Sequence, residues 1–376
     1  MNITTDTLEE VWHDMKAPGA YEWWYFDAED RDNGISVVII WFAGFPFSPY
    51  YNDRYDRWKS DTGSAPPLPA DYSGFSFQLY EKGRETVNFM REGTSGFFES
   101  SRQAIGARFE NNSFTFDQSK DEYRIDIDFS FPARQKEVKA SFVFKSCRRV
   151  VYEKKDGNGS GSQPFHQWLL SVPKAEVAGT IEIREKQGIL PRSIPVRAIG
   201  YHDHNVGAVP LQEYISRWYW GRAFSRHADI IYYLVFFRDR SLSPLTMLFL
   251  HDHEEGKTSV HHTLSIAESS FRRGFFAPQH CRVLDLSCAD ISLNIRHEQV
   301  LDSGPFYLRF TSGITYSRNG TGQERIRGIS EYLDPGRLQS RFMRLFTRSR
   351  IWRDGECSLM YDAYNNFKRS LDLKKT

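Results

Sequence analysis

The sequence predicts an all-β protein made of antiparallel sandwich or barrel units. Short runs rich in aromatic and β-branched residues recur along most of the chain, and several alternate polar and apolar residues with a period of two. Turn-forming residues separate these runs at short intervals, which is typical of antiparallel sheets. The length of 376 residues allows two domains, each with its own core.

The first half of the chain holds the clearest strand signals. The run ISVVIIWF at 35–42 is apolar throughout and long enough for a buried strand. The run YRIDIDFSF at 123–131 places its aromatic and aliphatic residues on one face and its charged residues on the other. Further strands are expected at 72–80, 113–116, 138–144, 168–172, 178–183 and 196–201.

A second series of strands follows the loop AVPLQEY at 208–214, which is the best candidate for a domain junction. We therefore expect an N-terminal β domain over 1–212 and a C-terminal β domain over 213–376. One short helix is expected near 335–347, because apolar residues recur there with helical spacing. The strands of the second series are expected at 218–223, 229–237, 245–250, 260–266, 292–296 and 307–315.

Composition narrows the range of partners. The chain has 49 basic and 48 acidic side chains and a formal net charge of +1, so nothing indicates a nucleic-acid partner. Aromatic residues make up 15% of the chain, a high share that favours a pocket for a flat or extended apolar ligand. We expect a hydrophobic small-molecule substrate, and the sequence leaves the oligomeric state open.

The cysteines and the N-terminus indicate the cellular compartment of the protein. The four cysteines form no CxxC pair, so we expect buried, reduced thiols rather than disulfides or a zinc site. The N-terminus is polar and acidic, without the features of a signal peptide, and no apolar run reaches membrane-spanning length. These features predict a cytoplasmic protein. The cysteines are Cys147, Cys281, Cys288 and Cys357.

The segment GYHDHNVG at 200–207 carries the strongest chemical signal. If it is a strand, His202 and His204 share one face, and Asp203 and Asn205 share the other. One interpretation makes Asp203 or His204 a proton donor or base beside an apolar cavity, because a carboxyl group surrounded by indoles keeps its proton to higher pH. The alternative is a buried polar network that joins two β units. His202 and His204 could be two ligands of a metal ion, but no third ligand follows at a spacing typical of metal sites. We therefore expect no bound metal.

A ring-rich segment, YEWWYFD at 21–27, has a similar character. In a strand, Glu22 and Trp24 share one face, and Trp23 and Tyr25 share the other. Rings that face a cavity stabilise a carbocation through their π faces, whereas the alternative is a core strand that happens to be rich in rings.

A second ring-rich segment, RWYWGR at 217–222, places Trp218 and Trp220 on one face. We expect one of these indoles to line a largely apolar pocket near the domain junction, together with Tyr201 and Trp23 or Trp24. One role for Arg222 is to orient a substrate carbonyl or carboxylate. The other is to pair with Asp203 or Glu22.

Four segments together resemble the carotenoid 1,2-hydratase (hydroxyneurosporene synthase) family: GAYEWWYFD at 19–27, GYHDHN-G, W-x-W-G-R and GISEYLDPGRLQSRF at 328–342. This family belongs to a lipocalin-like superfamily that also holds AttH-like proteins and Diels–Alderases. The resemblance implies two packed lipocalin-like β units, barrel or sandwich, with the ligand near their junction. It also implies catalysis without a redox cofactor.

The chain departs from the family pattern at two places. Val206 stands where hydratases of the family have the tryptophan of HDHNWG. Ile231, Tyr232 and Tyr233 stand in the stretch where they carry a Tyr-x-Asp pair that is important for activity. Tyr233 is therefore a candidate substrate-binding residue.

Three functions remain open. The first is a cofactor-independent hydratase, in which an acid protonates a terminal C=C of a polyene or isoprenoid and water captures the cation. Asp203 would be the acid or its orienting group, and His204 the base. The second is a cyclase or pericyclase, in which the folded shape of the substrate supplies most of the rate and Arg222 or His204 polarises a carbonyl. The third is a lipocalin-type carrier, which needs the pocket but not the HDHN cluster.

The segment 337–353 is cationic with interleaved aromatic residues. It fits peripheral contact with a membrane, into which polyenes partition, and it also fits a solvated amphipathic helix on the barrel surface.

Overall fold

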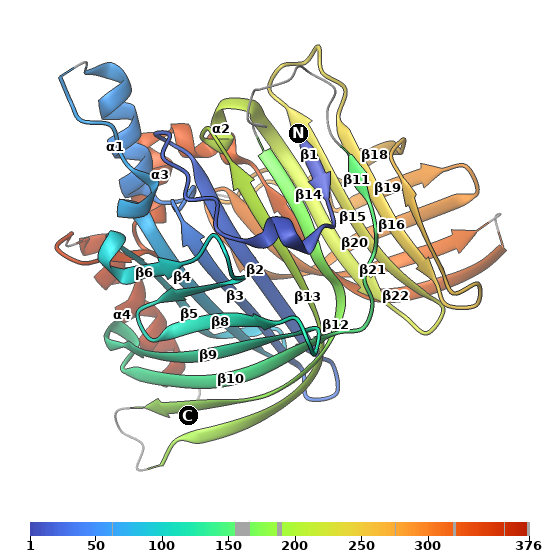
Figure 1. Ribbon diagram of the computed structural model, residues 1–376, viewed down its shortest axis with the longest axis horizontal. Coiled ribbons are helices and arrows are strands. Elements are labelled where there is room, and N and C mark those ends of the chain that lie inside the picture. The colour runs from blue at the N-terminus through green and yellow to red at the C-terminus, as the bar shows by residue number, and fades with distance from the viewer. Residues whose placement is uncertain are drawn as a thin grey trace. The chain divides into compact units, whose positions relative to one another are not determined.

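The computed structural model describes residues 1–61, 63–154, 166–185, 190–274, 276–318, 321–356 and 358–373. Most of these residues form two curled, mainly antiparallel sheets, so the all-β prediction is confirmed (Figure 1). The chain divides into two compact units, which we describe separately. Unit 1 comprises Met1–Pro210 and Leu345–Thr376, and unit 2 comprises Leu211–Arg344.

The sheet of unit 1 contains 14 strands among the described residues, in the order β23-β5-β4-β3-β2-β13-β12-β10-β9-β8-β7-β6, with β1 and β11 beside β12 and β1 respectively. The strands are β1 (Asn2–Thr4), β2 (Tyr21–Asp30), β3 (Ile35–Ala43), β4 (Ser73–Glu81), β5 (Arg84–Gly93), β6 (Phe98–Ser100), β7 (Gly106–Phe109), β8 (Asn112–Asp117), β9 (Glu122–Phe131), β10 (Lys136–Ser146), β11 (Glu153–Lys154), β12 (His166–Glu185), β13 (Arg192–Gly207) and β23 (Trp352–Arg353).

The sheet of unit 2 contains nine strands within the part of the chain that the structure describes, in the order β17-β16-β15-β14-β22-β21-β20-β19-β18. They are β14 (Ile215–Phe224), β15 (Ala228–Phe237), β16 (Leu245–Asp252), β17 (Lys257–His261), β18 (Ser265–Ser269), β19 (Val283–Cys288), β20 (Ile291–Ser303), β21 (Tyr307–Arg318) and β22 (Thr321–Leu333).

The helices are few and lie outside the sheets. The α-helices are α1 (Pro49–Ser60), α2 (Leu211–Tyr214), α3 (Arg341–Thr347) and α4 (Leu359–Leu373). The 3-10 helices are η1 (Thr7–Glu10), η2 (Pro69–Tyr72), η3 (Ser95–Phe97), η4 (Pro132–Arg134) and η5 (Pro335–Gln339). Within these described residues, no helix is long and apolar enough to cross a membrane.

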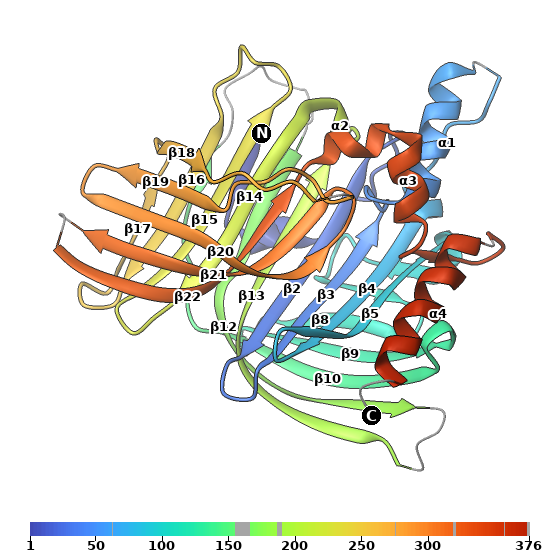
Figure 2. The same ribbon diagram turned by 180° about the vertical axis from the view of Figure 1, so that it is seen from behind.

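The helical segment expected near 335–347 is η5 followed by α3. Two longer helices, α1 and α4, were not expected from the sequence. α1 begins after Ser48, whose hydroxyl accepts hydrogen bonds from two backbone N–H groups of the first turn. α4 lies beside β5 of the same unit, and Lys368 forms an ion pair with Glu85 at 3.0 Å (Figure 2). The sequence of α1 has only a weak apolar stripe, so tertiary contacts hold this helix. The sequence of α4 is amphipathic, a signal that was overlooked.

Two strand predictions need correction. The strands expected at 168–172 and 178–183 are one continuous strand, β12. Its pairing with β13 shifts register between Leu169 and Ala175, and the chain stays in the sheet through these shifts. The single strand expected at 260–266 is two strands, since β17 ends at His261 and β18 begins at Ser265.

The C-terminal residues return to unit 1. The sequence-based division ran 1–212 and 213–376, whereas compact unit 1 includes Leu345–Thr376. Several contacts fix this return: β23 pairs with β5, and Arg348 forms an ion pair with Asp53 at 2.6 Å. Among the expected buried thiols, Cys147 is exposed, because it follows the end of β10, and Cys357 lies outside the described residues.

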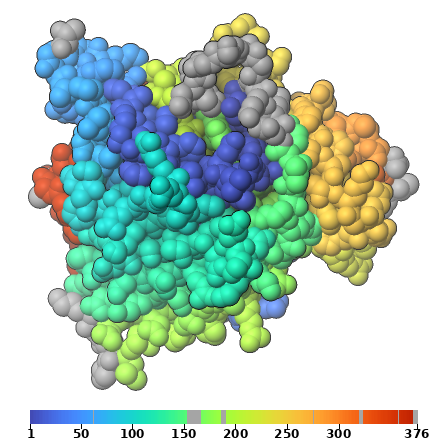
Figure 3. Space-filling view, viewed as in Figure 1, coloured from blue at the N-terminus to red at the C-terminus, as the bar shows by residue number. Residues whose placement is uncertain are grey.

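The core of unit 1 fills the inner face of its sheet with aromatic side chains such as Phe26, Trp41, Phe114 and Tyr123. The alternation predicted for 123–131 is confirmed, because the odd-numbered residues of β9 are buried. The N-terminal segment runs beside the teal part of this unit (Figure 3), and its Ile3 and Thr4 are buried. From there η1 sends Glu10 into the interior, where its side chain is fully buried.

Candidate active site

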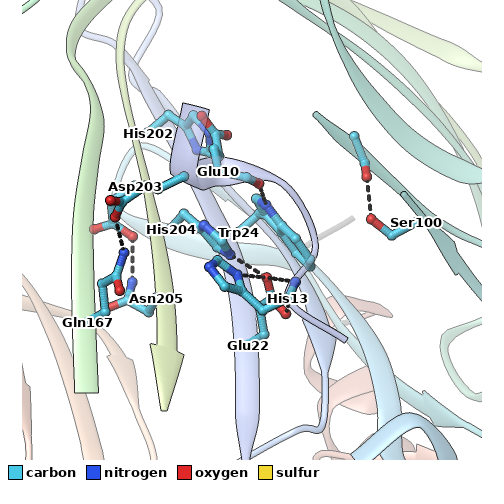
Figure 4. A network of polar contacts seen from close by, with 12 residues as sticks. Glu10, His13, Glu22, Trp24, Ser100, Gln167, His202, Asp203, His204 and Asn205 are labelled. Carbon is cyan, nitrogen blue, oxygen red and sulfur yellow. Dashed lines mark hydrogen bonds and ion pairs between the residues drawn. The ribbon is translucent and has the colours of Figure 1, made fainter. Parts of the chain in front are cut away.

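Strand β13 divides the four expected catalytic residues between the two faces of the sheet. His202 stacks on Phe26 and faces the core of unit 1, as does His204. Asp203 and Asn205 point the other way and hydrogen-bond to each other, at 2.8 Å (Figure 4). This is the alternation that the sequence predicted for a strand, but it separates the residues into two clusters.

Glu22 is the centre of the inner cluster. Its Oε1 accepts hydrogen bonds from Nδ1 of His13 and from Nε2 of His204, each at 2.9 Å. The backbone N–H of His13 also donates to both carboxylate oxygens, at 3.1 Å each. We call His13, Glu22 and His204 the Glu22 triad. Three chain segments meet in it: the N-terminal segment, β2 and β13 (Figure 4).

Burial and hydrogen bonding set the protonation of the triad. Burial alone raises the pKa of Glu22, but the hydrogen bonds from the two imidazoles outweigh it and the pKa lies below its ordinary value. Burial lowers the pKa of His204. At His13 burial acts in the same direction, but the hydrogen bond and charge of Glu22 prevail and raise the pKa. These shifts favour the ionised form of Glu22, the charged form of His13 and the neutral form of His204.

The second nitrogen of His204 is not satisfied. Its Nδ1 is buried and has no hydrogen-bond partner among the described residues. Since Nε2 donates its proton to Glu22, the neutral ring carries a lone pair on Nδ1. A buried acceptor without a partner is costly, so this atom is suited to receive a proton from a small bound group such as water.

Glu10 and His202 form a second pair on the same face. Nε2 of His202 contacts the Glu10 carboxylate, and Nδ1 donates to the backbone oxygen of Tyr25 at 2.9 Å. The other carboxylate oxygen of Glu10 accepts from the hydroxyl of Tyr123 at 2.6 Å. Because each polar atom of this pair has a partner, its arrangement suits a structural role that anchors the N-terminal segment.

Asp203 on the opposite face is also saturated. Its carboxylate accepts hydrogen bonds from Nε1 of Trp168 at 3.0 Å and from the hydroxyl of Tyr201 at 2.8 Å, in addition to that of Asn205. Three donors stabilise the ionised form of a carboxylate. A role for Asp203 in proton transfer stays a prediction.

The aromatic residues expected to bind substrate occupy both units. In unit 1, Trp24 lies on the inner face with the Glu22 triad, whereas Trp23 and Tyr25 lie on the face of Asp203. On that face the rings of Tyr25 and Tyr201 meet edge-on, with their centroids 6.2 Å apart. All four rings are buried.

In unit 2, Trp218, Trp220 and Arg222 lie on β14, and Tyr233 lies opposite Trp220 on β15. The ring centroids of Trp218 and Tyr233 are 6.2 Å apart, and the guanidinium of Arg222 lies 5.0 Å from the ring of Phe224. A pocket shared between the two sets of rings stays a prediction.

The Glu22 triad also has the donor set of a metal site. One ligand-type atom from each of its three residues lies within 4.8 Å of the other two. Two imidazoles and a carboxylate are a combination that catalytic zinc sites use. Both oxygens of Glu22 already accept the backbone N–H of His13, and the imidazole protons point at the same carboxylate. This arrangement fits a shared proton, and a chelation experiment can decide.

Sequence reasoning missed Glu10, His13 and Tyr123. The first two belong to the polar N-terminal segment, which shows neither strand nor helix periodicity. A buried role for such a segment follows only from its partners: β1 pairs with β12, and Glu10 reaches His202. The one available signal was a histidine and three carboxylates within residues 9–14, shortly before a ring-rich strand.

Comparison with known proteins places this geometry in context. Residues 39–359 match the family model of the carotenoid hydratase CrtC. The chain is 50% identical over 372 residues to a "hydroxyneurosporene dehydrogenase" of Chlorobaculum tepidum, covering 99% of this chain and 97% of that protein. It is 23% identical over 239 residues to an "acyclic carotenoid 1,2-hydratase" of Thiocapsa roseopersicina, covering 62% of this chain and 51% of that protein. The resemblance seen in the sequence motifs is thereby confirmed.

Solved structures bear out the fold. CghA, crystallised with Sch210972, superposes with a TM-score of 0.59 at 13% identity and covers 84% of this chain and 89% of its own. A putative AttH protein from Nitrosomonas europaea has a TM-score of 0.57 at 15% identity and covers 84% of this chain and 93% of its own. The lipocalin-like class is therefore confirmed, and at these identities the likeness concerns the fold alone.

Proposed function

The chain belongs to the CrtC family of carotenoid hydratases, and from this premise we propose that it adds water across a terminal trisubstituted C=C of a hydrophobic polyene isoprenoid. The family match over most of the chain supports this reaction class. The reaction is redox-neutral, since the elements of water are added and no electrons leave the substrate. We therefore propose that it needs no nicotinamide or flavin.

One observation carries the mechanism: His204 is held by Glu22 through Nε2 and offers a buried, unpartnered Nδ1. A fixed imidazole with one free nitrogen is the arrangement of a general acid–base catalyst. Asp203 lies on the opposite face of β13, so a single alkene cannot touch both groups at once. The proposal therefore routes both proton transfers through His204.

The imidazolium form of His204 gives its Nδ1 proton to the less substituted alkene carbon, and the π electrons form the new C–H bond. The tertiary cation that results is attacked by a water oxygen, which forms the C–O bond. Nδ1 of His204 then takes the excess proton from that oxygen and returns to its starting state. Alkene and water become a tertiary alcohol.

The rest of the triad orients the imidazole. His13 has a raised pKa and donates its Nδ1 proton to Glu22, and the same carboxylate holds the Nε2 proton of His204. Because Nε2 is already protonated, the proton that forms the imidazolium enters at Nδ1, from a water molecule on the open side of the ring. The lowered pKa of His204 makes its protonated form a stronger acid, which suits the protonation of a weakly basic alkene. The indole of Trp24 lies under the imidazole of His204, so its π face stabilises the imidazolium form that donates the proton.

The test is a turnover assay with purified protein, a linear polyene that carries a terminal trisubstituted C=C, and water labelled with a heavy oxygen isotope. The expected product has gained one labelled water, and His204→Gln abolishes its formation while Gln keeps the amide hydrogen bond to Glu22. A product that has instead lost two hydrogens, formed only with an added electron acceptor, would show a dehydrogenase and contradict the proposal.

A further inference from the structure

Unit 2 contains a hollow of about 510 Å³ whose wall is rich in arginine. Four arginines line it, Arg272, Arg282, Arg296 and Arg325, against a single carboxylate, Glu298. An excess of guanidinium groups around a concave surface favours binding of an anion, and of phosphate in particular.

Most of this positive charge is not neutralised within the protein. Arg325 forms an ion pair with Glu298 at 2.6 Å, and Nε of Arg296 donates to the side-chain oxygen of Asn294 at 3.2 Å. The guanidinium groups of Arg272 and Arg282 form no ion pair within the described ranges. Both side chains are exposed, so they are hydrated and remain available to an anion from solution.

A buried polar group also lines the hollow. His297 is 4% exposed, and its Nδ1 donates to the backbone oxygen of Cys281 at 2.8 Å. Its Nε2 has no hydrogen-bond partner among the described residues. Nε2 is an acceptor and donates no hydrogen bond to an anion, so the arginines alone carry the anion binding.

An apolar ring stands at the edge of the hollow. Phe271 lines it and is 53% exposed, and the next two residues, Arg272 and Arg273, are exposed as well. The turn is held in place, because Arg272 and His280 exchange two backbone hydrogen bonds of 2.9 and 3.0 Å. An exposed ring flanked by cations is the combination found where proteins meet the headgroup region of a membrane.

We propose that Phe271, Arg272, Arg273 and the arginine-lined hollow form a docking surface for an anionic phospholipid bilayer. The hollow takes lipid phosphate groups, and Phe271 enters the boundary between headgroups and acyl chains. Arg337, the first residue of the segment in which membrane contact was one interpretation of the sequence, donates to the backbone oxygen of Phe276 in the same unit, at 2.8 Å. The proposal rests on these residues and goes beyond the proposed hydration.

The test is co-sedimentation of the full chain with vesicles of phosphatidylcholine alone and of equal parts phosphatidylcholine and phosphatidylglycerol. The wild type is expected to bind only the anionic vesicles. Arg272→Gln with Arg282→Gln is expected to weaken that binding about 25-fold, because each arginine near an anionic surface contributes about fivefold. Phe271→Ser is expected to weaken it also. Arg197→Gln and Phe367→Ser, which change exposed residues of unit 1, are the matched controls and retain binding.

Several outcomes would overturn the proposal. The wild type could bind both kinds of vesicle alike or neither, or the double arginine variant, with an unchanged melting temperature, could keep its affinity. Titration calorimetry with inorganic phosphate is the second measurement. If the wild type binds phosphate but no vesicles, and the double variant no longer binds phosphate, the hollow is a site for a soluble anion. None of these readouts depends on turnover, so failure of the docking surface is distinguishable from failure of the hydratase proposal.

Discussion

The imidazole of His204 lies flat on the indole of Trp24, with ring centroids 4.7 Å apart and planes 7° from parallel. The indole is itself fixed, because its Nε1 donates to the backbone oxygen of Glu10 at 3.1 Å. Stacking on one side and the hydrogen bond to Glu22 at the edge leave the imidazole no freedom to rotate away. A positive charge on this ring is favoured by the π face beneath it.

The Glu22→Gln variant should lose turnover. The amide cannot accept from both imidazoles as the carboxylate does, so it no longer fixes the Nε2–H tautomer of His204 or keeps His13 charged. We expect kcat to fall about 100-fold, the lower end of what positioned acid–base groups contribute. The pH at which turnover declines should also move to lower values, because the charge of Glu22 no longer raises the pKa of the two histidines.

Asp203→Asn is the matched control for that variant, since it makes the same carboxylate-to-amide change in a buried residue one strand away. Its predicted effect on kcat is smaller, less than about tenfold, because Asp203 lies on the other face of the sheet. A larger loss of kcat in Asp203→Asn than in Glu22→Gln, with both variants folded, would move the chemistry to the Asp203 face.

Glu10→Gln should destabilise unit 1. The carboxylate of Glu10 accepts hydrogen bonds from Nε2 of His202 and from the hydroxyl of Tyr123, and an amide cannot accept both in the same way. A buried donor that loses its acceptor costs about 1–3 kcal/mol. The free energy of unfolding, measured by urea denaturation, is the readout. Glu137→Gln, which removes one side of an exposed pair with Arg184 at 3.8 Å, is the control and should cost less than about 1 kcal/mol. Equal losses in the two variants would show that Glu10 does not anchor the N-terminal segment.

Much of the fold was predictable because strand periodicity is a local property. The alternation in 123–131 and the apolar run at 35–42 each identify a strand from a few neighbouring residues. The opposite orientations of His202 and Asp203 followed from the same rule. The helix α4 was missed although its sequence is amphipathic. Its position in the fold depends on contacts such as that of Arg134 with Asn365, at 2.9 Å, which no local pattern reveals.

The composition of the site was less predictable than the strands. The grouping of Asp203 with His204 as acid and base treated neighbours in sequence as neighbours in space, whereas a strand sends them to opposite faces. The true neighbours of His204 include Glu22, on the adjacent strand, and His13, which lies 191 positions before it in the chain numbering. Long-range pairing of this kind depends on sheet topology, which the sequence pattern leaves open.

Treatment with EDTA should leave turnover unchanged. The triad could offer three ligands to a divalent ion, but its carboxylate already accepts several N–H groups, and the proposed chemistry needs only a proton. The measurement is kcat before and after chelation, with the metal content of the purified protein determined in parallel. The opposite result would be that the protein contains stoichiometric zinc, that EDTA removes both the zinc and the activity, and that added zinc restores the activity. His13, Glu22 and His204 would then be zinc ligands.

The stability of unit 1 should fall as the pH is lowered from neutral, with His166 as one cause. This histidine is buried, and burial lowers its pKa from 6.5 to about 3. The unfolded chain therefore takes up this proton first as the pH falls. The contribution of the neutral imidazole is fully present above pH 6.5 and is lost progressively down to about pH 3. Between pH 6.5 and 5 the loss from this one group should be about 1.5 kcal/mol.

The variant His166→Asn isolates that contribution, because an amide does not titrate in this range and can still hydrogen-bond to the hydroxyl of Tyr21, which lies 2.9 Å from Nδ1 of the histidine. The free energy of unfolding is measured by urea denaturation at pH 7, 6 and 5 for both proteins. Glu22 and His204, whose pKa values are also lowered, destabilise both proteins alike as the pH falls, so the difference between the two curves reports on His166. The gap should narrow toward acid pH as the wild type loses its advantage. If the free energies of unfolding of the two proteins instead depend on pH in the same way, His166 is protonated in the native state or is reached by water. Burial would then not control the charge of this histidine.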